Sequence, residues 1–268
     1  MRSEGAQLPY LCGRRPLAFA HRGGAALFPE NTLLAFEGAR RLGCRYIETD
    51  VHLSRDGVVV VMHDARLERT TNGRGWVREH TFAELRKLDA GYRFSPNGWS
   101  FPWRGQGLRI PSFEEVATSL PHVCFNVELK QANPPMVRPF LELIARLDLY
   151  DRVLVAAEDD DIAQAFRRLS RGRMATSAAR NEVLRFWIAA RAGATRLLRI
   201  PYEALQVPPR FGALTVIDKR FVEAAHESGL HVHAWTIDEP SEMRRLLALG
   251  ADGLMSDRPD LLVEIATN

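Results

Sequence analysis

The chain has 268 residues, of which 46% are hydrophobic and 26% are charged, a composition typical of a globular protein. Its 36 basic residues nearly balance its 33 acidic ones and are spread along the sequence, so the charge pattern gives no indication of a nucleic-acid partner. Three widely spaced cysteines indicate neither a disulfide framework nor a zinc site. The apolar runs are of strand length, so we expect no transmembrane segment and a cytoplasmic protein, with the oligomeric state left open.

The regular structure is expected to begin with a short apolar strand from Leu17 to Ala20. This strand leads into the sequence His21-Arg22-Gly23-Gly24, in which the two glycines allow a tight turn and a close approach of the backbone to a ligand. A helix should follow, with Asn31 or Thr32 as its N-cap and Gly43 at its end. The chain therefore opens with a strand and a helix.

The stretch from Tyr46 to Asp64 is expected to form a β-hairpin, because its four-residue turn is too short for a parallel crossover. In the first strand, Glu48, Asp50 and His52 occupy alternate positions and share one face. The return strand, residues 58–62, brings His63 back beside Asp50. Because buried carboxylates are costly without a partner, a cationic group is expected next to them.

The regular pattern is interrupted between Ala65 and Ile110, where we expect an insertion near the mouth of a site. A capping box that starts at Thr81 indicates one short helix up to Leu88. Six aromatic residues lie among the glycines and prolines of this stretch: Trp76, Tyr92, Phe94, Trp99, Phe101 and Trp103. These aromatic residues either form a satellite core beneath the loop or face a substrate.

Strand and helix signals then alternate to the end of the chain. Parallel strands are expected to begin near residues 17, 46, 123, 153, 174, 197, 231 and 253. Eight strands separated by helices predict an α/β fold, a (β/α)8 TIM barrel with the hairpin and the small insertion, residues 65–110, after the second barrel strand. A doubly wound open sheet is the alternative, but no G-x-G-x-x-G motif follows the first strand. We treat residues 1–268 as one barrel domain.

The polar residues of the sequence gather at the carboxyl ends of the expected strands, where TIM barrels place their active sites. Three carboxylates, those of Glu48, Asp50 and Glu128, favour a hard divalent cation, Mg²⁺ or Ca²⁺, over zinc. Arg22 and Lys130 add positive charge that suits a phosphate. Without a metal, Glu48 is expected to pair with Arg22. This combination of groups predicts a site for an anionic substrate.

Several histidines lie near these strand ends. His21 and His63 are suited to general acid and general base catalysis near neutral pH. His52 lies further along the hairpin and is expected to be solvated. We expect His231 and His233 to line the barrel interior or to pack against their neighbours.

Five segments resemble, in order and spacing, the motifs of the glycerophosphodiester phosphodiesterase family, which belongs to the phospholipase C-like phosphodiesterases. The segments are AHRGGAALFPENT, YIETDVHLSRDGVVVVMHD, NVELK, HAWTID and DGLMSDRP. The resemblance extends from about Leu17 to Pro259, and the first two segments are highly specific. It implies a metal-dependent barrel with an insertion at residues 65–110.

The resemblance also implies a role for each candidate residue. The implied roles are metal binding by Glu48, Asp50 and Glu128, acid–base catalysis by His21 and His63, phosphate binding by Arg22 and Lys130, and packing of Trp235 against the carbon skeleton of the substrate. A lone tryptophan would otherwise be more typical of a core.

The expected activity is the hydrolysis of glycerophosphodiesters to sn-glycerol 3-phosphate and an alcohol. A lysophospholipase D that acts on lysophospholipids is the first alternative, and a non-catalytic phosphodiester-binding protein is the second. The intact pair of histidines argues against the second alternative, because binding alone needs no acid–base pair.

Overall fold

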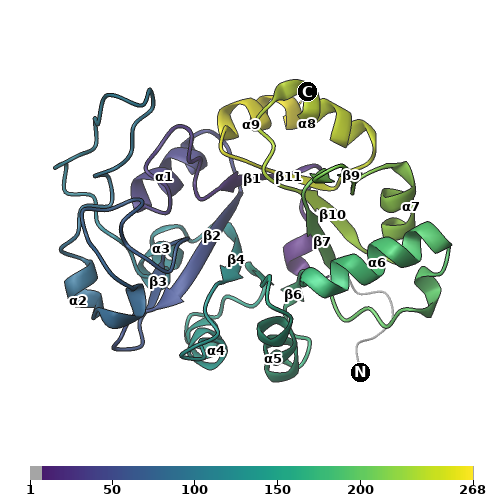
Figure 1. Ribbon diagram of the computed structural model, residues 1–268, viewed down its shortest axis with the longest axis horizontal. Coiled ribbons are helices and arrows are strands. Elements are labelled where there is room, and N and C mark those ends of the chain that lie inside the picture. Colours follow the sequence, from purple (N-terminus) through teal and green to yellow (C-terminus); the bar gives the residue numbers. More distant parts are fainter. Residues whose placement is uncertain (1–7, 268) are drawn as a thin grey trace.

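Eight parallel strands form a nearly closed barrel with helices on its outside, as the computed structural model of residues 8–267 shows (Figure 1). The barrel strands are β1 (Leu17–His21), β2 (Tyr46–Leu53), β4 (Cys124–Leu129), β5 (Val153–Ala156), β6 (Ala175–Thr176), β7 (Ala204–Val207), β10 (His231–Ala234) and β11 (Gly253–Ser256). Around the barrel their order is β6-β5-β4-β2-β1-β11-β10-β7. A parallel bridge between Ser177 and Ala204 joins the two end strands. The predicted TIM barrel is confirmed.

One helix follows each barrel strand and packs outside it. These helices are α1 (Leu33–Arg41), α3 (Phe113–Ser119), α4 (Val137–Arg146), α5 (Asp160–Ser170), α6 (Arg180–Ala192), α7 (Lys219–Glu227), α8 (Pro240–Ala248) and α9 (Pro259–Thr267). The remaining elements are η1 (Pro9–Leu11), β3 (Val59–Val61), η2 (Val77–Glu79), α2 (Phe82–Leu85), η3 (Thr195–Leu197), β8 (Arg210–Phe211) and β9 (Leu214–Thr215). Among the helices of residues 8–267, none has the length and apolar character needed to cross a bilayer.

The pleat of the strands decides which residues enter the barrel. An apolar layer near the amino ends of the strands includes Phe19, Tyr46 and Cys124, and the residues of η1 pack against it. Because side chains alternate between the two faces of a strand, residues two or four positions further along point into the same interior. Those positions are His21 on β1, Glu48 and Asp50 on β2, and Asn126 and Glu128 on β4. The register of the barrel thus delivers polar groups to one end of its interior.

The predicted strand from Leu197 to Ile200 is wrong. That segment contains η3 and an irregular stretch, and the barrel strand is β7, four residues beyond Ile200. Leu198 and Ile200 are partly buried against the core between the sheet and the outer helices, whereas Leu197 is 80% exposed. The apolar run therefore covers the outside of the barrel and takes no place in the sheet.

The structure decides between the two candidate N-caps of the first helix, α1. Thr32 is the N-cap, because its side chain accepts a hydrogen bond from the backbone N–H of Ala35. Asn31 has a φ of 57° and lies outside the helix, where its side chain serves the site described below.

The insertion has its own small core, and this core is aliphatic. It includes Val77, Leu85 and Ala90 from the insertion and Val60 and Met62 from the hairpin. The six aromatic residues named above are all half-buried or exposed. A seventh, Phe82, is partly buried and packs against this core. The interpretation in which these six residues form the satellite core is therefore wrong, and the rings of Trp99 and Phe101 are exposed.

His231 and His233 line the barrel interior, as expected. Both side chains are buried, and this burial lowers the pKa of His231 to about 4 and that of His233 to about 3. Both histidines are therefore neutral in the folded protein at pH 7, whereas in the unfolded chain they take up protons near pH 6.5. The contribution of the neutral histidines to stability is fully present above pH 6.5. It is lost as the pH falls from 6.5 toward the folded-state pKa values of about 4 and about 3.

We expect the free energy of unfolding to fall by up to about 1.4 kcal/mol per pH unit for each of these histidines below pH 6.5. Urea unfolding between pH 7.5 and pH 4.5 measures this slope. His233→Gln should reduce the slope, and His122→Gln, a change at an exposed histidine, should not. Equal slopes in the two variants would contradict the assignment to the buried ring.

Candidate active site

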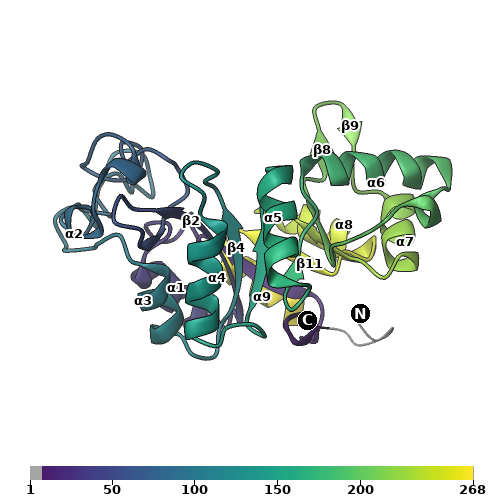
Figure 2. The same cartoon turned by 90° about the horizontal axis from the view of Figure 1, so that it is seen from below.

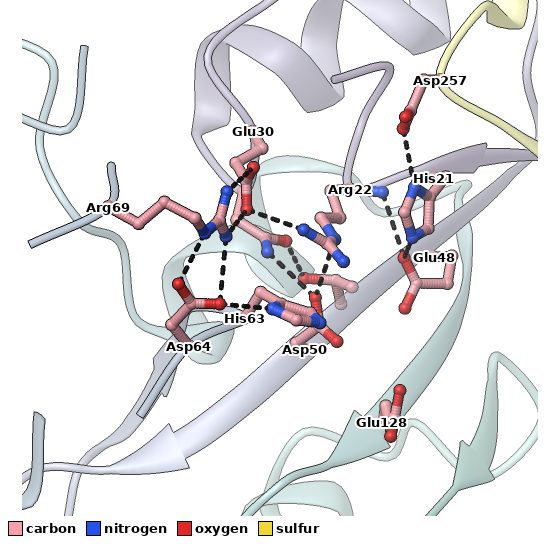
Figure 3. A network of polar contacts seen from close by, with 12 residues as sticks. His21, Arg22, Glu30, Glu48, Asp50, His63, Asp64, Arg69, Glu128 and Asp257 are labelled. Carbon is pink, nitrogen blue, oxygen red and sulfur yellow. Dashed lines mark hydrogen bonds and ion pairs between the residues drawn. The ribbon is translucent and has the colours of Figure 1, made fainter. Parts of the chain in front are cut away.

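Charged side chains from neighbouring strands meet at the carboxyl end of the barrel (Figure 3). In the registers of the parallel pairs, His21 lies beside Glu48 and Asp50 lies beside Glu128. The return strand β3 pairs antiparallel with β2, and the backbone N–H of Met62 donates to the carbonyl of Asp50. His63 therefore follows directly beside Asp50, as the sequence predicts.

Three carboxylates form the centre of the site. One oxygen each of Glu48, Asp50 and Glu128 lies within 4.8 Å of the other two. Glu48 and Asp50 are buried, and Glu128 is half-buried. An all-oxygen donor set at this spacing could bind a divalent cation.

The pKa values of these carboxylates show that the positive charges nearby do not balance the negative ones. Burial and the charge of Asp50 raise the pKa of Glu48 to about 8. Burial also raises the pKa of Glu128, although Lys130 opposes this effect. Asp50 differs, because the charges of Lys130, His63 and Arg22 outweigh its burial and lower its pKa. A bound divalent cation would remove the penalty on Glu48, so the residues present fit such an ion.

Arg22 adopts an unusual backbone conformation that turns several of its groups toward the site. Its φ is 51°, a left-handed conformation that costs a non-glycine residue about 1–3 kcal/mol. Its backbone N–H donates to Glu48 Oε2 at 3.1 Å, and its Nη1 donates to Glu30 Oε1 at 3.1 Å. The Nε lies 3.6 Å from Asp50 Oδ2 and has no hydrogen-bond acceptor within residues 8–267. The expected side-chain pair with Glu48 is thus replaced by a backbone contact, and the guanidinium of Arg22 pairs with Glu30 and Asp50 instead.

The glycine after Arg22 allows α1 to approach the turn closely. Gly23 has a φ of 85°, and a Cβ at this position would lie 2.7 Å from the Cβ of Ala35. Only glycine fits here without moving the helix.

Lys130 supplies the second cation of the site. Its Nζ lies 2.7 Å from Glu128 Oε2 and 3.2 Å from Asp50 Oδ1. Burial alone would lower the pKa of Lys130, but these two carboxylates outweigh burial and raise it. Lys130 therefore carries its charge throughout the neutral range.

Two histidines face the site, and a carboxylate orients each of them. The Nδ1–H of His21 donates to Asp257 at 2.6 Å, and the Nδ1–H of His63 donates to Asp64 at 2.6 Å. Both rings therefore leave Nε2 free to exchange a proton, and His21 Nε2 lies 3.8 Å from Glu48 Oε2. Burial lowers the pKa of His21, but the hydrogen bond to Asp257 and the charge of Glu48 outweigh burial and raise it.

A chain of ion pairs connects the two sides of the site (Figure 3). Arg69 donates to Asp64 at 2.5 Å and to both carboxylate oxygens of Glu30 at 2.7 Å. Glu30 in turn accepts from Arg22. The orientation of the His63 ring is thus coupled through three charged residues, Asp64, Arg69 and Glu30, to that of Arg22.

Asn31 holds Asp50 from the other side. Its Nδ2 donates to Asp50 Oδ2 at 3.1 Å, and its own Oδ1 accepts from the hydroxyl of Thr49 at 2.8 Å. Because one amide end is fixed by Thr49, the other end can only donate to the carboxylate.

The supporting residues were missed by the sequence interpretation. They are Glu30, Asn31, Asp64, Arg69 and Asp257. Asp64 follows a candidate histidine directly, and Asp257 follows the last barrel strand, so both positions carried a usable signal. Arg69 had none, since its partners depend on the path of the insertion.

The structure also places His52 and Trp235. His52 is buried, and its Nε2–H donates to the carbonyl of His63 at 3.1 Å, so the expectation that it is solvated is wrong. Its position fixes the turn that carries His63. Trp235 follows β10 and is 42% exposed, so it belongs to the rim of the barrel end and not to a core.

Asp257→Asn should lower kcat while leaving the fold and the carboxylate triad intact. The neutral amide cannot accept a charge-assisted hydrogen bond from the Nδ1–H of His21, so the ring loses its fixed orientation and part of its basicity. We expect a loss of roughly 10–100-fold in kcat with little change in metal affinity. Steady-state kinetics against Asp260→Asn, a change at a half-buried helix position outside the site, provides the comparison. Equal kinetics for the two variants would show that Asp257 does not orient His21.

Comparisons with known proteins agree with this geometry. The model of the glycerophosphoryl diester phosphodiesterase family matches residues 21–261. The chain is 35% identical over 255 residues to a probable glycerophosphodiester phosphodiesterase 2 of Mycobacterium tuberculosis, and the match covers 93% of this chain and 90% of that protein.

Two solved structures are similar along almost the whole chain. The glycerophosphoryl diester phosphodiesterase domain of an uncharacterized protein of Mycobacterium tuberculosis has a TM-score of 0.82 and 23% identity, with coverage of 92% of this chain and 97% of that chain. A phosphodiesterase of Oleispira antarctica, in complex with the product sn-glycerol 3-phosphate, has a TM-score of 0.74 and 25% identity, with coverage of 94% and 96%.

Proposed function

Because this chain belongs to the glycerophosphoryl diester phosphodiesterase family, we propose that its carboxylate–histidine site hydrolyses glycerophosphodiesters to sn-glycerol 3-phosphate and an alcohol. The chain is a phosphoric diester hydrolase of the TIM-barrel type. The observation that carries the mechanism is the pair of histidines, His21 and His63, each anchored at Nδ1 by a carboxylate and free at Nε2.

Glu48, Asp50 and Glu128 would hold a divalent cation, and their oxygen donors favour Mg²⁺ or Ca²⁺. When bound, such an ion neutralises phosphate charge and polarises the phosphorus–oxygen bond. Arg22 and Lys130 flank the same carboxylates and would bind the phosphate oxygens.

The acid–base roles fall to the two free Nε2 atoms. One histidine takes the proton of the attacking oxygen, and the other gives a proton to the leaving alkoxide. The attacking oxygen belongs either to water or to the neighbouring hydroxyl of the glycerol, which gives a cyclic phosphate first. Trp235, at the rim, would pack against the carbon skeleton of the substrate.

Lysophospholipase D activity is the second candidate, and the exposed aromatic residues of the insertion favour it. Trp99 and Phe101 stand at the surface beside the catalytic end of the barrel, where they could contact an acyl chain.

Parallel assays distinguish the two substrate classes. Wild-type protein and His63→Ala are compared on glycerophosphocholine, glycerophosphoethanolamine and a lysophospholipid. Release of sn-glycerol 3-phosphate from the first two, lost in His63→Ala, supports the proposed reaction. A kcat/KM at least tenfold higher on the lysophospholipid would establish the alternative.

We further propose that the chain acts in a reducing compartment such as the cytoplasm, as a single domain of residues 1–268. Cys44 and Cys124 are buried thiols that form no disulfide within residues 8–267, which supports a reducing environment. Mass spectrometry of thiol-labelled protein from cells tests this proposal, since three reduced cysteines are expected.

A further inference from the structure

Exposed apolar side chains stand on two projections at the catalytic end of the barrel. One projection is the loop of residues 92–104 within the insertion, where Trp99 is 79% exposed. The other is the tip of the β8–β9 hairpin, residues 211–214, where Phe211 is 75% and Leu214 is 55% exposed. Both connect the carboxyl end of a strand to the next helix, so both lie on the side of the active site. Figure 2 shows them on opposite flanks of the barrel, both toward the top of the view.

Arginines accompany the aromatic rings of the 92–104 loop. The guanidinium of Arg104 lies 3.9 Å from the ring centroid of Phe101 and 4.3 Å from that of Tyr92. Arg93 also stacks on Tyr92, at 5.4 Å. Within residues 8–267, neither arginine forms an ion pair with a carboxylate. Arg104 Nε donates to the carbonyl of Tyr92 at 3.0 Å. Both guanidinium groups are therefore held at the surface by aromatic rings, and their remaining N–H groups face no carboxylate of residues 8–267 and can meet an external anion.

The net positive charge of the protein comes from the insertion. Residues 65–110 contain nine Lys or Arg and four Asp or Glu, a net charge of +5, whereas the whole chain carries +3. The rest of the chain is therefore slightly acidic, at −2. This asymmetry directs the positive side of the molecule toward its catalytic end.

We propose that the 92–104 loop and the 211–214 hairpin tip dock the enzyme on an anionic lipid surface. Tryptophan and phenylalanine side chains would enter the boundary between head groups and acyl chains, and the stacked arginines would meet lipid phosphates. A flat surface that touches both projections faces the catalytic end of the barrel, where the carboxylate triad lies. The net charge of +5 on the insertion and the arginines stacked on its rings complement lipid phosphates. This charge complementarity favours an anionic lipid surface over a protein partner.

Any effect of docking on turnover rests on the proposed function, whereas binding of the protein to a lipid surface does not. Vesicle binding is therefore measured in chelator, separately from turnover. Loss of binding with intact hydrolysis of glycerophosphocholine would reject only the docking surface, and loss of hydrolysis with intact binding would reject only the proposed reaction.

The test is co-sedimentation with vesicles of phosphatidylcholine alone or mixed with phosphatidylglycerol. Wild-type protein should bind the mixed vesicles at least about 10-fold more tightly than the neutral ones, and added salt should weaken this binding. Trp99→Ser and Phe211→Ser should each weaken binding by roughly 10-fold, because each removes a large apolar side chain from the interface. Trp99→Phe should retain most of the binding.

Leu197→Ser provides the matched control. Leu197 is as exposed as Trp99, but it lies between α6 and β7, at the opposite end of the barrel. This variant should bind vesicles like wild type. Binding that depends on salt but is equal in all variants would overturn the proposal, as would failure of the wild type to bind mixed vesicles. A concentration-dependent dimer that Trp99→Ser and Phe211→Ser abolish would assign the two projections to self-association.

Discussion

Replacing His63 with alanine should lower kcat by roughly 10²–10⁴-fold, which is the usual contribution of a positioned acid or base. The Nε2 of His63 is one of two titratable nitrogens that the site leaves free, because Asp64 holds the opposite ring nitrogen. His21→Ala should have an effect of similar size for the same reason. Steady-state kinetics on glycerophosphocholine with saturating metal measures both losses.

The two histidines should act as a unit with opposite protonation states. The pH profile of kcat/KM should then be bell-shaped, and each alanine variant should lose one limb of it. The double variant should be little worse than the worse single variant, since either loss already breaks the proton relay. His122→Ala is the control at an exposed histidine. Near-wild-type turnover of His63→Ala would show that another group acts as the acid or base. His52, which contacts the carbonyl of His63, would be the next candidate.

Glu48→Gln should reduce activity by more than about 100-fold, because even supporting residues of metal sites are worth 10–100-fold. It should also change the stability of the metal-free protein. Burial and Asp50 raise the pKa of Glu48 to about 8, whereas the unfolded carboxyl titrates near pH 4.5. Metal-free wild type therefore loses stability as the pH rises from 4.5 toward 8, and Glu48→Gln should not.

Thermal unfolding of both proteins in chelator, at pH 5 and pH 8, tests this expectation. The variant should melt at the higher temperature at pH 8, and the difference should shrink at pH 5. Adding Mg²⁺ or Ca²⁺ should raise the melting temperature of wild type more than that of the variant. A wild type that is more stable than Glu48→Gln at pH 8 in chelator would show that the triad does not lack positive charge.

The fold was predictable because its signals are local. Alternation along each strand and helical spacing between strands predict the barrel, and the short turn at residues 54–57 places His63 beside Asp50. The failure at Leu197–Ile200 has a physical cause, since an apolar run can cover the outside of a barrel as well as enter its sheet. Periodicity does not distinguish these two uses in a segment of four residues.

The site was predictable only in part, because its support depends on contacts between distant residues. Asp257 orients His21 across 236 positions of sequence, and Arg69 reaches Glu30 across 39. No spacing rule relates such pairs. The burial of His52 was missed for a similar reason, because the carbonyl that it contacts belongs to the returning strand.

The most direct test of the account is the release of sn-glycerol 3-phosphate from glycerophosphocholine by chelator-treated protein, before and after Mg²⁺ or Ca²⁺ is added back. The account predicts no turnover in chelator, recovery on addition of the cation, and free choline as the second product. Full turnover without a divalent cation, or release of glycerol together with phosphocholine, would contradict it.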